Sequence, residues 1–175
     1  KHKFIDFNNQ KYMFLLKDYI KKSDVVITNF KHGDSKRFQL SYNDCKTINP
    51  KVIYAHIGGF KSNSKRVAFD VVLQAETGFL SMCGTLNEFA KMPVALIDVL
   101  AAHQIKEGIL IALLKREKTG KGCHIKTTLE ETAIASLMNQ SSNYLMAEHN
   151  PKKLGTLHPN IAPYGDIINS MDGTK

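Results

Sequence analysis

Two short runs of β-branched and aromatic residues constrain the fold more than any other feature of this sequence. The first is DVVITN at residues 24–29, and the second is KVIYAHI at residues 51–57. Each run is compact and apolar, which is typical of a strand buried on both faces of a parallel sheet. Helical patterns precede the first run, at residues 10–22, and separate the two, at residues 41–48. This alternation predicts an α/β fold with an open parallel sheet.

The other elements are predicted from periodicity and from turn residues. Ser41 is expected to be the N-cap of the helix that runs to Ile48. The remaining predictions are a strand at 3–7, short helices at 35–40 and 69–77, a long helix from Asp98 to 118, a strand at 124–129 and a second long helix at 130–146. We divide the chain into residues 1–127, which form part of a large domain, and residues 128–175, a long helix and a linker towards a smaller domain.

The composition excludes several functional classes. The net charge is +8, but the basic residues are scattered and no aromatic-interleaved basic segment accompanies them, so we expect no nucleic-acid partner. No apolar run approaches the roughly 18 residues of a membrane span, and we expect no membrane partner. The three cysteines have no CxxC spacing, which argues against a structural metal site and favours a reducing, cytoplasmic compartment.

Asp98 is the strongest candidate for chemistry. It is the only acidic residue between Glu88 and Glu107, and it lies where an apolar loop becomes a helix. A carboxylate at this position is most often a helix cap. The same helix end would keep the carboxylate ionised, as a nucleophile towards an activated carbonyl requires. Position alone does not choose between the two roles.

The chain resembles the class III CoA-transferases, a family that includes formyl-CoA and carnitine CoA-transferases and the related α-methylacyl-CoA racemases. Five segments carry the resemblance and together span nearly the whole chain: residues 23–33 (SDVVITNFKHG), 48–60, 70–78, 96–122 and 158–165 with 172–173. The resemblance implies a Rossmann-like large domain, a smaller second domain and an interlocked homodimer. Because the family's first strand would precede Lys1 and its glycine-rich loop would follow Lys175, we expect an internal piece of a longer chain with the second domain largely absent.

The resemblance also implies an activity, in which CoA moves from an acyl-CoA to a carboxylic acid. Asp98 would attack the donor thioester and form a mixed anhydride, and the released CoA thiolate would return to give an aspartyl-CoA thioester. No metal and no tightly bound cofactor are implied, and coenzyme A is a substrate and a product. The family's contacts map onto substrate-binding Phe69 and Asp70 and onto a CoA-binding set: Asp6, Phe7, Asn8, Asn29, Phe30, Lys31, Arg37, Phe38, Arg66, Val67 and Ala68.

Residue chemistry supports part of this set. Lys31, Arg37 and Arg66 are cations of the kind that bind CoA phosphates, and Phe38 offers an apolar surface for adenine. The racemase branch carries a proton-transferring His where this chain has Phe69. A racemase needs two bases on opposite faces of the α-carbon, so Phe69 favours transfer over epimerisation. A racemase and a non-catalytic CoA-binding module remain the alternatives.

Overall fold

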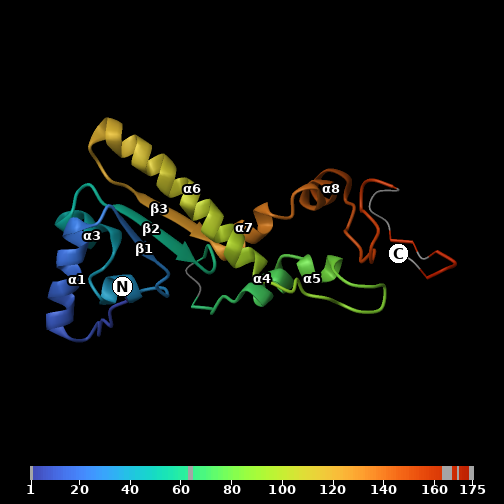
Figure 1. The fold of residues 1–175 in the computed structure, drawn as a ribbon, viewed down its shortest axis with the longest axis horizontal. Coiled ribbons are helices and arrows are strands. Elements are labelled where there is room, and N and C mark those ends of the chain that lie inside the picture. The colour runs from blue at the N-terminus through green and yellow to red at the C-terminus, as the bar shows by residue number, and fades with distance from the viewer. Residues whose placement is uncertain (1, 63–64, 163–166, 169, 174–175) are drawn as a thin grey trace. The chain divides into compact units, whose positions relative to one another are not determined.

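The computed structural model describes residues 2–62, 65–162, 167–168 and 170–173 (Figure 1). Its contacts divide the chain into two compact units. Unit 1 comprises Lys1–Ala68 and Asp98–Thr132, and unit 2 comprises Phe69–Ile97 and Ala133–Lys175. In the part of the chain that the structure describes, no helix is both long enough and apolar enough to cross a bilayer.

Unit 1 is built on a parallel sheet of three strands, in the order β1-β2-β3. The strands are β1 (Val25–Thr28), β2 (Ile53–Gly58) and β3 (His124–Thr128). Thr28 pairs with His56, so β1 ends two residues before β2 does. The predicted α/β class with an open parallel sheet is therefore confirmed.

One face of this sheet is covered by α1 (Gln10–Lys22) and α3 (Tyr42–Ile48). Successive strand residues point to opposite faces, and on this face Val52 and Tyr54 join Ile20 of α1 and Cys45 of α3 in a buried apolar cluster. The local signals that predicted α3 are present, because the Ser41 hydroxyl and the Asp44 carboxylate form a capping box. The predicted bounds of α1 and the predicted N-cap Ser41 are confirmed.

The opposite face is covered by α6 (Leu96–Thr119), which lies along β3 in Figure 1. A Cβ on Gly108 of α6 would lie 2.9 Å from the Ile125 side chain, so this glycine permits close packing of the helix on the strand. Ile53 and Ala55 of β2 are fully buried on this side. Ile27 of β1 shares this face of the sheet but is 61% exposed, so α6 does not cover this part of β1.

Beyond α6, the chain turns sharply into β3. Gly120 has a φ of +66°, which favours glycine, and Gly122 lies so close to β2 that an added Cβ would be 2.0 Å from the carbonyl oxygen of Val52. The Gly122 N–H donates to the Pro50 carbonyl at 3.0 Å. The two glycines thus end the helix and let the chain pass against the start of β2.

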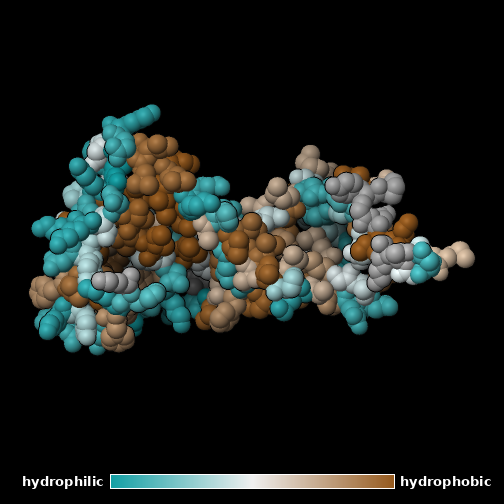
Figure 2. All heavy atoms as spheres, viewed as in Figure 1, coloured by the Kyte–Doolittle hydropathy of each residue, from teal (hydrophilic) through white to brown (hydrophobic). Residues whose placement is uncertain are grey.

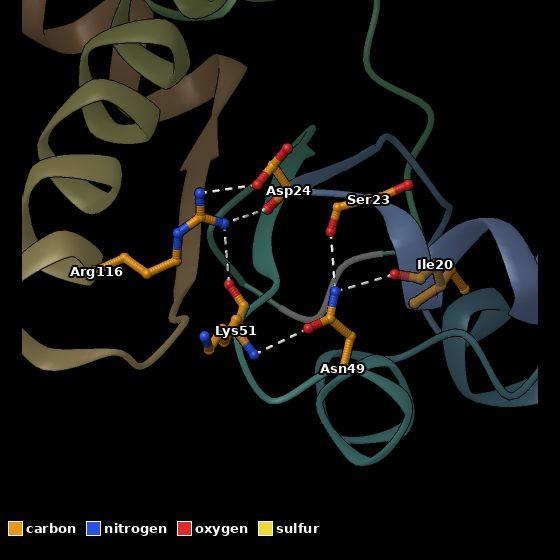
Figure 3. Close-up of polar contacts among 6 residues, drawn as sticks. All are labelled: Ile20, Ser23, Asp24, Asn49, Lys51 and Arg116. Carbon is orange, nitrogen blue, oxygen red and sulfur yellow. Dashed lines mark hydrogen bonds and ion pairs between the residues drawn. The ribbon is translucent and has the colours of Figure 1, made fainter.

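Arg116, one turn earlier, binds the amino ends of β1 and β2 together (Figure 3). Its guanidinium donates to the Asp24 carboxylate at 2.9 Å and to the carbonyls of Asp24 and Lys51 at 3.4 and 3.3 Å. Beside it, the Asn49 amide donates to the carbonyls of Ile20 and Ser23, which satisfies the end of α1. This edge of unit 1 is therefore held by side-chain bonds to backbone carbonyls.

Unit 2 contains α4 (Asp70–Glu76), α5 (Phe79–Met82), α8 (Asn139–Ala147) and most of the remaining loops. The buried Gln74 side chain accepts from the Met92 N–H at 2.8 Å, which ties the loop before α6 to α4. The Asn160 side chain bonds to Asn139 and Asn143 of α8. Residues 163–165 of the 158–165 segment lie outside the described residues.

Two predicted elements are wrong. Residues 3–7 form no strand, because the chain turns at Asp6–Asn9 on its way into α1. The helix predicted at 130–146 is two helices, α7 (Leu129–Ala135) and α8, separated by a turn in which Met138 has a φ of +52°. A non-glycine residue with positive φ breaks the helical path, which apolar spacing alone does not reveal.

Candidate functional site

The carboxyl edge of the unit 1 sheet is where ligands collect in open α/β proteins. Here β1, β2 and β3 end at Thr28, Gly58 and Thr128. The predicted CoA-binding residues of segments 29–31 and 66–68 lie in the connections that leave β1 and β2. All eleven predicted CoA-binding residues belong to unit 1.

Three phenylalanines bring the early segments together. The rings of Phe7 and Phe38 stack with centroids 4.6 Å apart, and Phe30 packs against both at 5.8 and 6.0 Å. They border the buried cluster under α1 and α3. Phe38 was predicted as a surface for adenine, and its ring is half-buried within this aromatic cluster. The segments 6–8, 30 and 37–38 therefore form one neighbourhood.

Arg37 lies on the outside of this neighbourhood. It ends α2 (Asp34–Arg37), its guanidinium lies 4.4 Å from the centroid of the Phe38 ring, and it pairs with Asp34 at 3.2 Å. A guanidinium carries five N–H donors, and one carboxylate uses at most two. The side chain is 68% exposed, so donors remain available to an anionic ligand.

Four further residues that were predicted to bind CoA flank these phenylalanines in the sequence: Asp6, Asn8, Asn29 and Lys31. The Asp6 carboxylate accepts from the Asn8 N–H at 2.9 Å and fixes the turn into α1. Asn29 and Lys31 are exposed after β1, and the Lys31 carbonyl accepts from the Asp34 N–H. Lys31 can therefore offer its ammonium group to solvent or to a ligand.

Arg66, Val67 and Ala68 occupy a second neighbourhood, in the connection that follows β2. The Arg66 guanidinium lies 4.4 Å from the centroid of the Phe60 ring. Val67 is 52% exposed, and Ala68 packs so closely on Gly59 that a Cβ on that glycine would lie 2.5 Å from the Ala68 Cβ. The two neighbourhoods follow adjacent paired strands.

Asp98 lies in the first turn of α6 and its side chain is exposed. The sequence predicted that the helix starts at Asp98, but α6 begins two residues earlier, at Leu96. A carboxylate within the first turn interacts favourably with the positive end of the helix dipole. Its place and exposure suit a nucleophile, and its catalytic role stays a prediction.

The two predicted substrate-binding residues belong to unit 2. The Asp70 carboxylate accepts from the Ile97 N–H at 2.7 Å and also from the Gln74 side-chain amide. Asp70 thereby satisfies one of the backbone donors at the start of α6. Phe69 is 63% exposed and has an extended backbone as the N-cap of α4. A ligand role for either residue stays a prediction.

A polar network near the carboxyl edge was not foreseen from the sequence. The Thr28 hydroxyl lies 3.0 Å from Nδ1 of His56 and donates to the Tyr54 hydroxyl at 3.2 Å. The Tyr54 hydroxyl in turn donates to the Leu40 carbonyl at 2.8 Å. Burial lowers the pKa of His56 below its ordinary value of 6.5, and the nearby Lys126 and His124 lower that pKa further. A histidine inside an otherwise apolar strand was the available signal.

A cleft of about 460 Å³ lies at the amino edge of the sheet and is partly basic. Lys21, Lys22 and Lys51 line it together with Arg116. The helices α1 and α6 both end at this edge, and the negative ends of their dipoles attract cations and oppose anions. These side chains therefore serve the helix ends, and the cleft is a poor phosphate site.

Metal-ligating groups do not converge in the described ranges: no group of three or more His, Cys, Asp or Glu side chains there could hold an ion. The three cysteines, Cys45, Cys83 and Cys123, are free thiols.

Comparison with known proteins places this geometry in a family. The model of CoA-transferase family III matches residues 1–173, so the chain belongs to that family, and the resemblance seen in the sequence is confirmed.

Succinate--glutarate CoA-transferase of Agrobacterium fabrum is 34% identical over 163 residues, which are 91% of this chain and 40% of the relative. Succinyl-CoA:glutarate CoA-transferase of Homo sapiens is 29% identical over 173 residues, 97% of this chain and 39% of the relative. The crystal structure of a CAIB/BAIF family protein from Brucella suis is similar with a TM-score of 0.86 and 35% identity, over 97% of this chain and 46% of that one. The chain thus spans less than half the length of each of these proteins.

Proposed function

We propose that the full-length protein is a CoA-transferase that moves CoA from an acyl-CoA to a carboxylic acid, with Asp98 as the nucleophile. The family match over residues 1–173 carries this proposal. The exposed position of Asp98 in the first turn of α6 supports it, because a nucleophile must be ionised and accessible.

In the proposed reaction, an Asp98 carboxylate oxygen attacks the thioester carbonyl and the carbon–sulfur bond breaks. The products of this step are a mixed anhydride and CoA thiolate. The thiolate then attacks the aspartyl carbonyl of the anhydride, which releases the donor acid and leaves an aspartyl-CoA thioester. An acceptor carboxylate attacks the aspartyl carbonyl of this thioester and displaces CoA thiolate, which gives a second mixed anhydride. The thiolate then attacks the acceptor carbonyl of that anhydride, which forms the new acyl-CoA and frees the Asp98 carboxylate. Energy of the thioester is retained throughout, and no external oxidant or base is consumed.

The CoA moiety is proposed to lie across the two neighbourhoods at the carboxyl edge. Arg37 and Lys31 on one side, and Arg66 on the other, would pair with its phosphates. Phe38 would contribute apolar surface near the adenine through the rim of its ring, because the neighbouring phenylalanines already cover part of it. Coenzyme A enters as a substrate, and the proposal includes no tightly bound cofactor and no metal.

The acids are proposed to be dicarboxylic. The relatives named above act, by their names, on succinate or succinyl-CoA and glutarate, and a further relative from Acetobacter aceti, 29% identical over 164 residues, is an acetyl-CoA:oxalate CoA-transferase. The assay is CoA transfer by the full-length protein from succinyl-CoA to glutarate, oxalate and monocarboxylates of matched length. Faster transfer to a dicarboxylate supports the proposal, and no transfer to any acid contradicts it.

The same protein can be tested for epimerisation, the alternative activity. Phe69 is an apolar side chain that can neither accept nor donate a proton. The protein should therefore exchange no α-proton of a 2-methylacyl-CoA with deuterated water in the absence of an acceptor acid. Exchange at a rate comparable to transfer would favour the racemase alternative.

The proposal includes a homodimer of the full-length protein. Apolar side chains remain uncovered on the outer side of α6, where Leu110, Ile111 and Leu114 are 54%, 67% and 69% exposed. Figure 2 shows an apolar patch at the place that α6 occupies in Figure 1. Patches of this kind mark surfaces that pack against further polypeptide. A cytoplasmic location is also proposed, because the three cysteines are free thiols.

A further inference from the structure

The connection that follows β2 comprises residues 59–68, of which the structure describes 59–62 and 65–68, and we call it the Arg66 loop. Its neck is the contact between Gly59 and Ala68, where only a glycine leaves room. Within it, Arg66 lies over the Phe60 ring at 4.4 Å. Three cations, Lys61, Lys65 and Arg66, lie on this short segment. Like charges on one short segment repel one another, so an anchor outside the loop would help to hold one conformation.

Glu130, in the first turn of α7, supplies that anchor with two hydrogen bonds. Its backbone N–H donates to the Gly59 carbonyl at 3.1 Å. Its side-chain Oε2 accepts from the backbone N–H of Lys61 at 2.8 Å. One residue thus holds the loop at two points, two residues apart. The bond to Oε2 joins positions 69 residues apart in the sequence.

The neighbouring Glu131 contributes less. Its carboxylate pairs with the Lys61 ammonium at 3.2 Å, but the two side chains are 44% and 76% exposed. Exposed ion pairs of this kind contribute little to stability. Glu131 is instead engaged with Thr128, whose hydroxyl donates to the carboxylate at 3.0 Å and accepts from the Glu131 N–H. The Glu130 bonds, which involve the loop backbone, therefore restrain the loop more than the Glu131 ion pair does.

We propose that Glu130 is a positioning residue that holds the Arg66 loop in the conformation that binds CoA. Glu130 acts through the loop backbone and need not touch the substrate. The inference rests on the proposed function for the ligand, but the clamp itself is independent of any ligand. Loss of the clamp should weaken acyl-CoA binding and leave the chemical step unchanged.

The test compares three variants of the full-length protein. Glu130→Met removes the acceptor but retains an unbranched side chain, and Glu130→Gln retains an acceptor oxygen. Glu117→Gln is the control, because Glu117 is an exposed residue at the opposite edge of the sheet. Hydrogen exchange is measured on a peptide covering residues 59–68, without ligand. KM for acyl-CoA and kcat are measured separately.

Glu130→Met should accelerate exchange in the peptide about tenfold and raise KM for acyl-CoA by about fivefold to tenfold, as expected for one lost hydrogen bond. Its kcat should stay within about twofold of the parent value, as expected when binding alone is weakened. Glu130→Gln should restore most of the exchange protection and of the KM, and Glu117→Gln should change neither.

Unchanged exchange in Glu130→Met would overturn the clamp. Faster exchange with an unchanged KM, or a lower kcat at constant KM, would overturn its role in CoA binding. If Glu130→Met does not fold, hydrogen exchange in Glu130→Gln tests the clamp instead. The amide oxygen is a weaker acceptor than the carboxylate, so exchange should still be measurably faster than in the parent. Equal exchange would overturn the clamp. A parent protein that shows the clamp but binds no acyl-CoA would refute the proposed function and leave the clamp standing.

Discussion

Replacing Arg116 with alanine tests how the amino edge of the sheet is held. The Arg116 side chain is 14% exposed, whereas that of its partner Asp24 is 77% exposed. An ion pair with one end in solvent contributes at most about 1 kcal/mol. The arginine also donates to the carbonyls of Asp24 and Lys51, which join β1 to the segment before β2. These carbonyl bonds and the buried stem of the side chain, rather than the charge pair, should account for most of its contribution.

The magnitude follows from these contacts. The carbonyl bonds are long, at 3.3 and 3.4 Å, so we assign about 1 kcal/mol to the two together. Truncation of the mostly buried stem costs about 1 kcal/mol more. With the ion pair included, Arg116→Ala should lower the free energy of unfolding by about 2–3 kcal/mol. Asp24→Asn should lower it by less than about 1 kcal/mol, since only the exposed pair is lost.

Urea unfolding followed by circular dichroism measures both changes. Lys115→Ala is the matched control, because Lys115 is an exposed cation on the same helix, and its loss should change stability by no more than about 0.5 kcal/mol. If Asp24→Asn is as costly as Arg116→Ala, the charge pair is the main term and the reasoning is refuted. A cost below about 1 kcal/mol for Arg116→Ala would refute it as well.

Three further predictions concern unit 1. Gly122→Ala should destabilise the fold by about 3 kcal/mol in the same urea assay, because the new Cβ would meet the Val52 carbonyl oxygen, a backbone atom that cannot easily move. The free energy of unfolding should fall as the pH drops below 6.5, because the pKa of His56 is lowered in the folded protein and the unfolded chain therefore binds a proton that the folded protein does not. His56→Gln should flatten this dependence between pH 7 and 5. An unchanged slope in that variant would contradict the prediction. Burial, with the Asp44 carboxylate adding to it, raises the pKa of the Cys45 thiol to about 11, so a thiol reagent at pH 8 should label Cys45 only after unfolding, as peptide mapping can show.

The elements that the sequence predicted well are those specified by neighbouring residues. The helix α1 combines apolar periodicity with lysines in its last turn, and α3 begins with a cap whose partner lies three residues away. The strands β1 and β2 follow from compact β-branched runs. Each of these signals lies within a few residues of the element it defines, so a single sequence suffices to find it.

The features that were missed depend on distant contacts or on single backbone angles. The break between α7 and α8 rests on the positive φ of Met138, although its neighbours have helical spacing. Arg116 looked like one more surface cation, but it binds backbone carbonyls from residues 65 and 92 positions away. No sequence motif indicated the contact between Glu130 and Lys61, because these two residues are brought close by the pairing of β2 with β3.

The candidate site was predictable in parts for the same reason. The resemblance placed CoA-binding residues in segments that the fold brings to the carboxyl edge of one sheet. It did not indicate that Phe38 packs between neighbours in an aromatic cluster, nor that the Asp70 carboxylate is bound to the start of α6. Both contacts are made with residues that are distant in the sequence, and both affect how these side chains could bind a ligand.

Trapping of the covalent intermediate tests the central claim most directly. The full-length protein is incubated with acyl-CoA alone, treated with hydroxylamine, digested and mapped by mass spectrometry, alongside Asp98→Asn and the control Glu107→Gln from the same helix. The account predicts a hydroxamate on the peptide that contains Asp98 in the parent and in Glu107→Gln, and none in Asp98→Asn, which should also lose transfer activity. A hydroxamate on another carboxylate, or full transfer activity in Asp98→Asn, would contradict it.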